Sequence, residues 1–342
     1  MKTNNNIPAY RFQGYTDAWE LRKLGEFVDK AVDNRGKTPP LDEEGTHPLI
    51  EVAALGGVHP DYTKIDKYLN DESFENNLRS YIKKDDILFT TVGSIGLVSL
   101  MDSREEAAIA QNIVAFRAKD NFVPSYLYSL FTNKENQLKA IRIVMGAVQP
   151  SIKVSQLVDV EYMLTQNRFE QKAIGTFFST LDCQITLHQR KLDTLKEQKK
   201  TYLKLLFPAK GQTKPALRFQ GFEDDWEEVK LGDISKMYQP QTITGSELTD
   251  EGVPVFGANG YIGYYSDSNH VTDQVTISAR GEGTGTPNFV KAPVWITGNS
   301  MVINVDENKN IDKKFLYANF LAFDFKKYVS GGAQPQLTRD VL

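Results

Sequence analysis

Residues 167–207 read NRFEQKAIGTFFSTLDCQITLHQRKLDTLKEQKKTYLKLLF, and this stretch decides how the chain is organised. It contains one glycine, Gly175, and no proline before Pro208, so nothing in it should interrupt a helix. Its apolar residues recur at alternating steps of four and three, the heptad pattern of a coiled coil, with His188 and Lys199 as polar interruptions. At about 1.5 Å per residue, roughly forty residues would span about 60 Å. We predict one long helix whose apolar seam is Ile174, Phe178, Leu181, Ile185, Leu192, Leu195, Tyr202 and Leu206.

A seam of this length would leave a long apolar stripe in water, so we expect it to pair with another helix. Outside the apolar seam residues the helix carries six basic side chains, which are typical of the solvated face of a coiled coil. They are Arg190, Lys191, Lys196, Lys199, Lys200 and Lys204.

An internal repeat flanks the helix. Residues 8–25 (PAYRFQGYTDAWELRKLG) and 215–232 (PALRFQGFEDDWEEVKLG) match at twelve of eighteen positions, at a constant offset of 207. The similarity fades and then returns at residues 146–150 (GAVQP) and 331–335 (GGAQP). A shared frame with a divergent interior indicates one task performed on two different targets, although a plain duplication would leave the same pattern.

The short apolar runs between these frames, such as 86–92 and 274–278, are typical of β-strands bounded by glycine turns, whereas 125–144 and 313–329 are typical of helices. We therefore predict an α+β fold: two similar mixed α/β domains joined by a long coiled-coil-forming helix. The expected boundaries are 1–165 for the first domain, 166–210 for the helix and 211–342 for the second domain. Trp19 and Trp226 occupy matching positions, which favours packing in the domain core over stacking on bases.

The composition narrows the class of protein. The chain has 342 residues, a formal net charge of −4 and one cysteine, Cys183, which suits a reducing, cytoplasmic location and excludes an internal disulfide. It contains no apolar run long enough to cross a membrane and no signal peptide. Lys/Arg and Asp/Glu number 10 and 4 in residues 166–214, a net charge of +6, but 11 and 17 in residues 215–342, a net charge of −6. Strong binding to DNA would therefore require local patches of basic residues or a partner subunit.

Residues 169–175 (FEQKAIG), with Phe177-Phe178, Leu181-Asp182 and 185–192 (ITLHQRKL), closely resemble the conserved helix of type I restriction-modification specificity subunits. The Trp-x-x-x-x-Leu-Gly frames at 19–25 and 226–232 resemble the start of each target recognition domain in that family, and the Gln-Pro segments at Gln149 and Gln334 resemble the end of each domain. The resemblance covers essentially the whole chain.

This resemblance implies a subunit with no catalytic site and no cofactor of its own. Each recognition domain would read one half of a bipartite site in double-stranded DNA, and the helix would set the spacing and dock two methylation subunits. Those partners would use S-adenosylmethionine to methylate adenine, and motor-nuclease subunits would restrict DNA with ATP and Mg. The expected geometry is consistent with this role, because two recognition domains held a fixed distance apart require two half-sites at one fixed spacing.

The sequence departs from the family pattern at its end. Val341-Leu342 matches Gln156-Leu157, before any counterpart of the long helix, so we expect a truncated or rearranged subunit whose helix pairs with a second specificity chain. Two alternatives stay open. One is a regulatory or inhibitory fragment that competes for methylation subunits, and the other is a paired-domain scaffold with no role on DNA.

Motifs for other chemistry are absent or weak. The sequence has no adenine-methyltransferase Pro-Pro motif, no P-loop and no metal-ligand spacing among its four histidines. Residues 281–285 (GEGTG) could suggest a nucleotide loop, but Pro287 follows where a helix should begin, which favours a DNA-facing loop. Cys183 lies beside the seam and is expected to pack rather than react.

Base reading requires exposed polar side chains: Arg or Lys for guanine, Asn or Gln for adenine. The loops that meet this requirement give the candidate DNA-binding residues, although a purely structural turn is an equally good explanation for each loop taken alone. The candidates are Arg35, Lys37, Thr38, Ser94, Gln149 and Lys153 in the first domain, and Gln241, Asn259, Tyr261, Arg280, Gln334 and Arg339 in the second. No metal site is expected.

Overall fold

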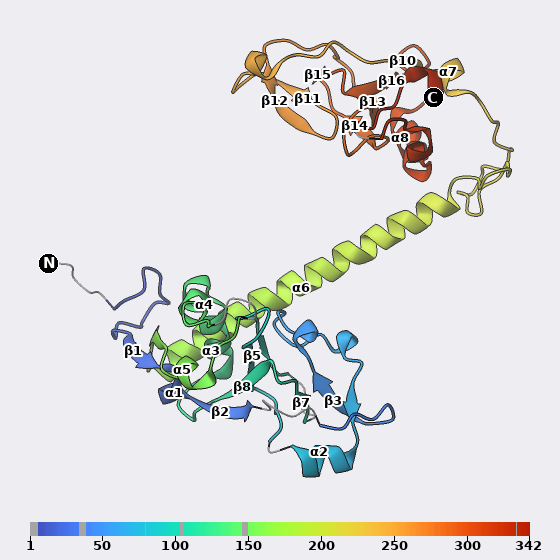
Figure 1. The fold of residues 1–342 in the computed structure, drawn as a ribbon. Helices are drawn as coiled ribbons and strands as arrows, with labels where there is room; N and C mark the ends of the chain where they lie inside the picture. Colours follow the sequence, from blue (N-terminus) through green and yellow to red (C-terminus); the bar gives the residue numbers. More distant parts are fainter. Residues whose placement is uncertain (1–5, 34–38, 79, 103–105, 146–149, 333) are drawn as a thin grey trace. The chain divides into compact units, whose positions relative to one another are not determined.

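The computed structural model describes residues 6–33, 39–78, 80–102, 106–145, 150–332 and 334–342. The chain divides into two units, Met1–Gln189 and Arg190–Leu342. One continuous helix, α6 (Arg168–Leu205), belongs to both (Figure 1). The prediction of two mixed α/β domains joined by one long helix is confirmed.

The first unit contains two antiparallel or mixed sheets and a two-stranded pair. The strands are β1 (Glu20–Lys23), β2 (Val28–Asp33), β3 (His47–Ile50), β4 (Tyr68–Leu69), β5 (Ile87–Thr90), β6 (Val98–Leu100), β7 (Ala108–Ile109), β8 (Ile113–Ala118) and β9 (Glu161–Leu164). They pair in the orders β2-β8-β5-β6, β4-β3-β7 and β1-β9. The helices are α1 (Leu24–Phe27), α2 (Asp71–Asn77), α3 (Pro124–Thr132), α4 (Lys134–Ile141) and α5 (Val154–Leu157).

The second unit repeats this topology. Its strands are β10 (Lys236–Tyr238), β11 (Val253–Phe256), β12 (Tyr261–Tyr265), β13 (Gln274–Ser278), β14 (Pro287–Val290), β15 (Trp295–Ile296) and β16 (Ser300–Asn304), and its helices are α7 (Leu231–Ile234) and α8 (Lys313–Ala322). The orders β10-β16-β13-β14 and β12-β11-β15 correspond strand by strand to the two larger sheets of the first unit. In both units the smaller sheet holds one parallel pair, β3·β7 and β11·β15. The sequence repeat is thus a structural repeat.

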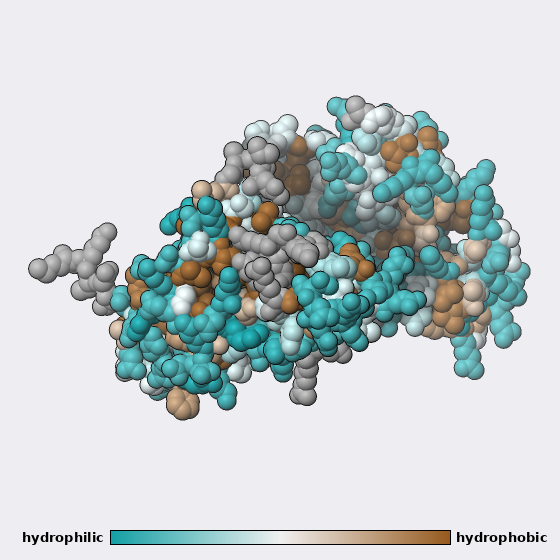
Figure 2. Space-filling model, turned by 60° about the horizontal axis from the view of Figure 1, so that its bottom comes forward, coloured by the Kyte–Doolittle hydropathy of each residue, from teal (hydrophilic) through white to brown (hydrophobic). Residues whose placement is uncertain are grey.

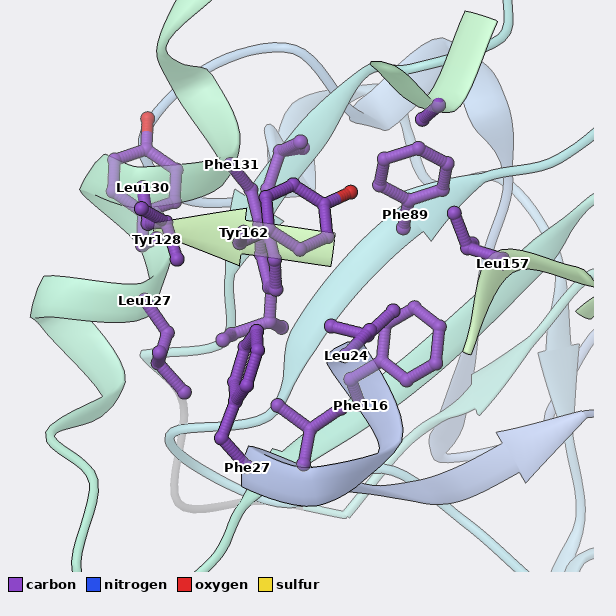
Figure 3. Close-up of a cluster of buried hydrophobic side chains, with 14 of the residues drawn as sticks. Leu24, Phe27, Phe89, Phe116, Leu127, Tyr128, Leu130, Phe131, Leu157 and Tyr162 are labelled. Atoms are coloured by element: carbon purple, nitrogen blue, oxygen red, sulfur yellow. The ribbon is translucent and has the colours of Figure 1, made fainter. Parts of the chain in front are cut away.

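Alternation along the central strands builds the core on both faces of each larger sheet. In β5, Ile87 and Phe89 point into a cluster with α3 and α1, whereas Leu88 points into a second cluster on the opposite face. Figure 3 shows the first cluster, in which Phe27 and Phe131 pack around Tyr162. In β13, Val275 and Ile277 pack with α8 in the same way.

Two predicted helices are shorter in the structure. The stretch 125–144 breaks at Asn133, whose side chain caps α4 by accepting hydrogen bonds from the Glu135 and Asn136 amides. The stretch 313–329 ends as an α-helix at Ala322, and a 3-10 turn, Phe325–Tyr328, follows. Capping side chains determine where these helices end. The pattern of apolar residues in the sequence does not reveal such caps.

The start of α6 is packed tightly into the first unit. Asn167 caps the helix, and Gln171, fully buried, accepts a hydrogen bond from the Val123 amide (2.9 Å) and donates one to the Thr165 carbonyl (2.9 Å). Gly175 lies so close to α3 that a Cβ there would come within 2.4 Å of the Ser125 hydroxyl.

A bidentate ion pair completes this packing. Arg11 donates to both carboxylate oxygens of buried Glu170, at 2.6 and 2.8 Å. The Trp19 indole also donates to Glu170 (3.4 Å), and its ring contacts Tyr126 edge to face. We call Arg11, Phe12, Trp19 and Tyr126 the first anchor, because these four residues hold the base of α6.

Candidate nucleic-acid interface

Two predicted loops of the first unit lie side by side. Residues 91–96 follow β5, and residues 150–153 run next to them: the Ile152 amide donates to the Thr91 carbonyl (2.9 Å) and Val92 forms a bridge with Ser151. Burial of Ile152 fixes the second segment, whereas Ser94 and Lys153 are exposed. We call these segments the first loop pair.

The second unit builds the same arrangement. The loop 279–285 follows β13, the Leu337 amide donates to the Ala279 carbonyl (2.9 Å), and Arg280 forms a bridge with Gln336. A further backbone hydrogen bond also matches between the two units. The Thr91 amide donates to the Asn112 carbonyl, and the Ala279 amide donates to the Asn299 carbonyl, both at 2.8 Å. We call residues 279–285 and 334–337 the second loop pair. Its backbone hydrogen bonds match those of the first loop pair, but its side chains differ.

Glycines give both loop pairs their turns. Gly93 and Gly281 stand at corresponding positions with φ of +75° and +84°, a left-handed conformation that other residues adopt only with strain. A Cβ at either position would meet nothing within 4 Å, so the requirement is for backbone conformation alone. The 281–285 glycines thus form a turn, and the structure shows β14 from Pro287 where a nucleotide-binding loop would continue as a helix.

Asn259 is held against the second loop pair. It lies in the turn between β11 and β12, and its carbonyl oxygen accepts a hydrogen bond from the Ser278 hydroxyl (2.7 Å). Its side-chain NH2 donates to no described residue. A Cβ on Gly283 would overlap the Asn259 amide at 2.1 Å, so only glycine there leaves Asn259 in place. The amide is therefore oriented and still has donors to offer a ligand.

Arg280 and Gln334 are exposed on the second loop pair, and the Arg280 guanidinium forms no ion pair with a described residue. Tyr261, 56% exposed, follows Asn259 and contacts Phe256 edge to face. Arg280 and Gln334 thus belong to the second loop pair, and Tyr261 lies two residues after Asn259, which is held against that pair.

Two further candidates, Gln241 and Arg339, lie on other segments of the second unit. Gln241 is exposed, and its backbone carbonyl accepts a hydrogen bond from the Trp295 indole (3.3 Å). Trp295 belongs to β15, and the connection that follows this strand contains Asn299. Arg339 is exposed and lies 3.7 Å from Asp340. Arg35, Lys37, Thr38 and Gln149 fall outside the described residues.

The predicted seam on α6 has partly buried ends and an exposed middle. Ile174 packs against the core of the first unit, and Leu206 lines a cavity in the second. Between them, Ile185, Leu192 and Leu195 are 66%, 46% and 51% exposed, and no other described element covers them. Figure 2 shows apolar residues as brown patches on a mostly polar surface. The seam is available for pairing.

The anchor of α6 was missed by sequence reasoning. Arg11 and Arg218 repeat in the aligned frames, but the partner of Arg11, Glu170, lies 159 residues away. The feature of the sequence that could have indicated the anchor is the Arg-Phe pair that occurs in both repeats. The structure holds no group of three His, Cys, Asp or Glu side chains suited to a metal among the described residues, and none of the described helices has the length and apolar character to cross a membrane.

Comparisons with known proteins agree with this architecture. Residues 16–197 and 223–342 match the family model of the type I restriction modification DNA specificity domain. A Mycoplasma genitalium protein described as a type I specificity subunit is 22% identical over 342 residues, which are 99% of this chain and 82% of that protein. The specificity subunit of the type I restriction enzyme MjaX from Methanocaldococcus jannaschii is 25% identical over 250 residues, and these span 68% of this chain but only 57% of that relative.

A solved structure shares the fold. The crystal structure of the type I restriction-modification S subunit from M. genitalium superposes with a TM-score of 0.64 at 20% identity, over 94% of this chain and 79% of that one. Because the family model covers most of the sequence in both repeats, the assignment does not rest on fold alone. The chain therefore belongs to the type I restriction-modification specificity family and is a DNA specificity subunit, a non-catalytic part of the restriction-modification complex.

Proposed function

We propose that the two units read the two halves of one bipartite DNA site, with recognition domains at 1–165 and 211–342 and a connecting helix at 166–210. The observation that carries this proposal is the loop pair, which has the same backbone frame in both units but the sequence TVGSIG at 91–96 and ARGEGTG at 279–285. One frame with two sets of side chains can present different groups to different base edges.

The side chains of the second loop pair suit base reading. A guanidinium such as that of Arg280 can donate twice to guanine, and an oriented amide such as that of Asn259 can pair with adenine. The proposed DNA-contacting set is Ser94, Lys153, Gln241, Asn259, Tyr261, Arg280, Gln334 and Arg339, together with Arg35, Lys37, Thr38 and Gln149 from outside the described residues.

Charge explains why this subunit would work inside a complex. Residues 215–342 carry 11 Lys/Arg against 17 Asp/Glu, so the second domain by itself repels the phosphate backbone. We propose that two methylation subunits, docked on α6, supply the missing affinity together with S-adenosylmethionine for adenine methylation. Motor-nuclease subunits would add ATP- and Mg-dependent restriction.

Replacing Arg280 with alanine should relax recognition at one position of one half-site. Loss of a bidentate contact to guanine costs about 1–3 kcal/mol, or roughly 5- to 150-fold in discrimination. The measurement is methylome sequencing of cells that express the methylation subunit with each variant. Lys309→Ala, which removes an exposed cation of the same unit away from the loops, is the control and should leave the motif unchanged.

Three outcomes of this experiment separate the candidate functions. A bipartite methylated motif that appears with the wild-type chain and degenerates with Arg280→Ala supports the proposal. Loss of an existing motif on expressing the wild-type chain would instead indicate a subunit that competes for the methylation subunits. If Arg280→Ala leaves the motif intact, Arg280 does not read a base.

We also propose that the exposed middle of the seam pairs with a helix of another specificity chain. Replacing Leu192 with glutamate places a charge in the pairing surface and should abolish concentration-dependent association measured by sedimentation velocity. Arg190→Glu, a charge reversal at an exposed position on the face opposite the seam, should preserve association. A wild-type chain that sediments as a stable monomer at all concentrations would contradict the proposal.

A further inference from the structure

Each loop pair is hydrogen-bonded to a short segment that precedes it in the chain. In the first unit Met145 exchanges two backbone hydrogen bonds with Ser151, both of 2.9 Å. In the second unit Ser330 exchanges two with Gln336, of 2.9 and 3.0 Å. The two segments correspond at the same offset of 185 residues as the GAVQP and GGAQP stretches that follow them. We call them the first and second flanking segments, residues 140–145 and 325–330.

Burial supports this correspondence. Ala140 and Phe325, the first residues of the two flanking segments, are both buried in the core of their own unit. Four residues later, Val144 and Val329 are both partly buried against the same cores. The two segments therefore present equivalent positions to the outside of the molecule.

Each flanking segment also lies beside the loop that follows the central strand of its unit. In the first unit Gln137, three residues before the segment, donates a hydrogen bond to the Gly96 carbonyl (3.2 Å). Gly285 is the counterpart of Gly96, with φ of +87° against +88°, and a Cβ there would lie 3.3 Å from the Lys326 amide nitrogen. The flanking segment thus adjoins both strands of its loop pair.

The third residue of each flanking segment is a cation. Arg142 and Lys327 are both exposed, and neither forms an ion pair with a described residue. The Lys327 ammonium lies 4.1 Å from the ring centroid of Phe323 and 5.2 Å from that of Tyr328, which helps to hold it beside the segment. Equivalent positions next to the two loop pairs therefore carry the same charge.

The surrounding sequence has a local excess of positive charge. Residues 134–157 contain 4 Lys/Arg against 1 Asp/Glu, and residues 323–342 contain 3 against 2, whereas the whole chain contains 40 against 44. The parts of this acidic chain that lead into the loop pairs are thus the ones that attract an anion.

The shared charge indicates a ligand that is the same in both half-sites. Side chains that read bases should differ between the units, whereas the phosphate backbone is common to every DNA sequence. A protein partner docked in the same way on both units would require apolar contacts in both. The exposed neighbours are not shared in this way, since Ile141 corresponds to Lys326 and Met145 to Ser330.

We infer that Arg142 and Lys327 each bind a backbone phosphate beside one half-site, and so position their loop pair on the DNA without reading its sequence. The inference rests on the proposed function, in which the loop pairs face DNA. It assigns to these two cations a role different from that of Arg280, whose replacement should change the recognised bases. Arginine and lysine can exchange at such a site, because a phosphate attracts either charge.

The test uses the complex of the full chain with its methylation subunit and two DNA duplexes. One duplex carries the motif found by methylome sequencing, and in the other both half-sites are scrambled. Binding is measured by fluorescence anisotropy from about 50 to about 200 mM KCl. We expect the slope of log Kd against log salt to fall by about 0.9 with Arg142→Ala or Lys327→Ala, and by about 1.8 with both. A fourfold rise in salt should thus weaken the wild type about 3.5-fold more than either single variant.

Matched variants separate a phosphate contact from other roles. Arg142→Lys and Lys327→Arg keep the charge and should keep the wild-type slope. Lys309→Ala removes an exposed cation of the second unit away from the loops and should also keep it. Both alanine variants should weaken the two duplexes by the same factor and leave the methylated motif unchanged, whereas Arg280→Ala should reduce the preference for the motif duplex.

The possible failures are distinct. Equal binding of the wild type to the two duplexes would contradict the proposed function, but the slopes on the scrambled duplex would still test the two cations. Unchanged slopes for both alanine variants would overturn the inference. A changed motif in either variant would show that its side chain reads a base, and loss of the methylation subunit on gel filtration would show that it contacts protein. Each of these two results would overturn the phosphate assignment.

Discussion

Glu170→Gln should lower the free energy of unfolding of the first unit by about 3 kcal/mol, because it leaves the Arg11 guanidinium facing a neutral amide in a buried site. The charge of Glu170 is held by two hydrogen bonds from Arg11 at 2.6 and 2.8 Å and a weaker one from Trp19. Native-state hydrogen exchange of the α3 amides reports this loss, and the α8 amides of the second unit serve as the internal control.

The same ion pair predicts a dependence on pH. Burial alone would raise the pKa of Glu170, but hydrogen bonds from Arg11 and Thr165 outweigh burial and hold the pKa below its ordinary value. A lowered folded-state pKa gives stability that is complete above the ordinary pKa, about 4, and that is lost as the pH falls through the folded value. Protection of α3 should therefore decline below about pH 4 in the wild type, and less steeply in Glu170→Gln.

Two further variants test the explanation. Arg11→Met combined with Glu170→Met should recover much of the lost stability, since an apolar pair of similar size leaves no buried charge. Arg218→Met should change the stability of the second unit far less than Glu170→Gln changes that of the first, because Arg218 is paired with no carboxylate among the described residues. If Arg218→Met proves as costly as Glu170→Gln, the environments of Arg218 and Arg11 do not differ as described.

Local pattern was enough to predict much of the fold. Asn167 and Pro208 bracket the long helix, and α6 runs from Arg168 to Leu205, as a capping residue and a helix breaker require. The strand at 274–278 was predicted to the residue, because a run buried on both faces stands between polar turns. The two repeats predicted a shared topology, and the strand orders match.

Contacts between distant residues could not be predicted in this way. Nothing near Arg11 in the sequence indicates that its partner is Glu170, and nothing near Asn259 indicates that Gly283 leaves room for its amide. The candidate loops were recognised one at a time, as exposed polar turns. Their pairing depends on long-range hydrogen bonds such as that from Leu337 to Ala279, which tertiary packing determines.

Gly175→Val should destabilise the first unit by about 2 kcal/mol or more, and Gly175→Ala should destabilise it less but in the same direction. A Cβ at this position would lie 2.4 Å from the Ser125 hydroxyl and 2.8 Å from the Tyr126 amide nitrogen, so α6 would have to move away from α3. In a helix free of such contacts the sign would be opposite, since alanine stabilises a helix by about 1 kcal/mol relative to glycine. Ser179→Ala, at an exposed position of the same helix, is the matched control and should be neutral or slightly stabilising.

The sign of the Gly175→Ala effect therefore tells whether α6 is rigidly seated on α3 or only tethered to the first unit. Rigid seating matters for the proposed function, because a helix that is to set the spacing of two reading domains can do so only if its base has one orientation. Unfolding followed by α3 hydrogen exchange measures the stability, and methylome sequencing of the assembled complex measures the consequence. We expect Gly175→Val to lose methylation at the wild-type motif under conditions where the second unit stays folded. Stabilisation by alanine, with methylation intact in the valine variant, would mean that close packing at Gly175 is not what orients the helix.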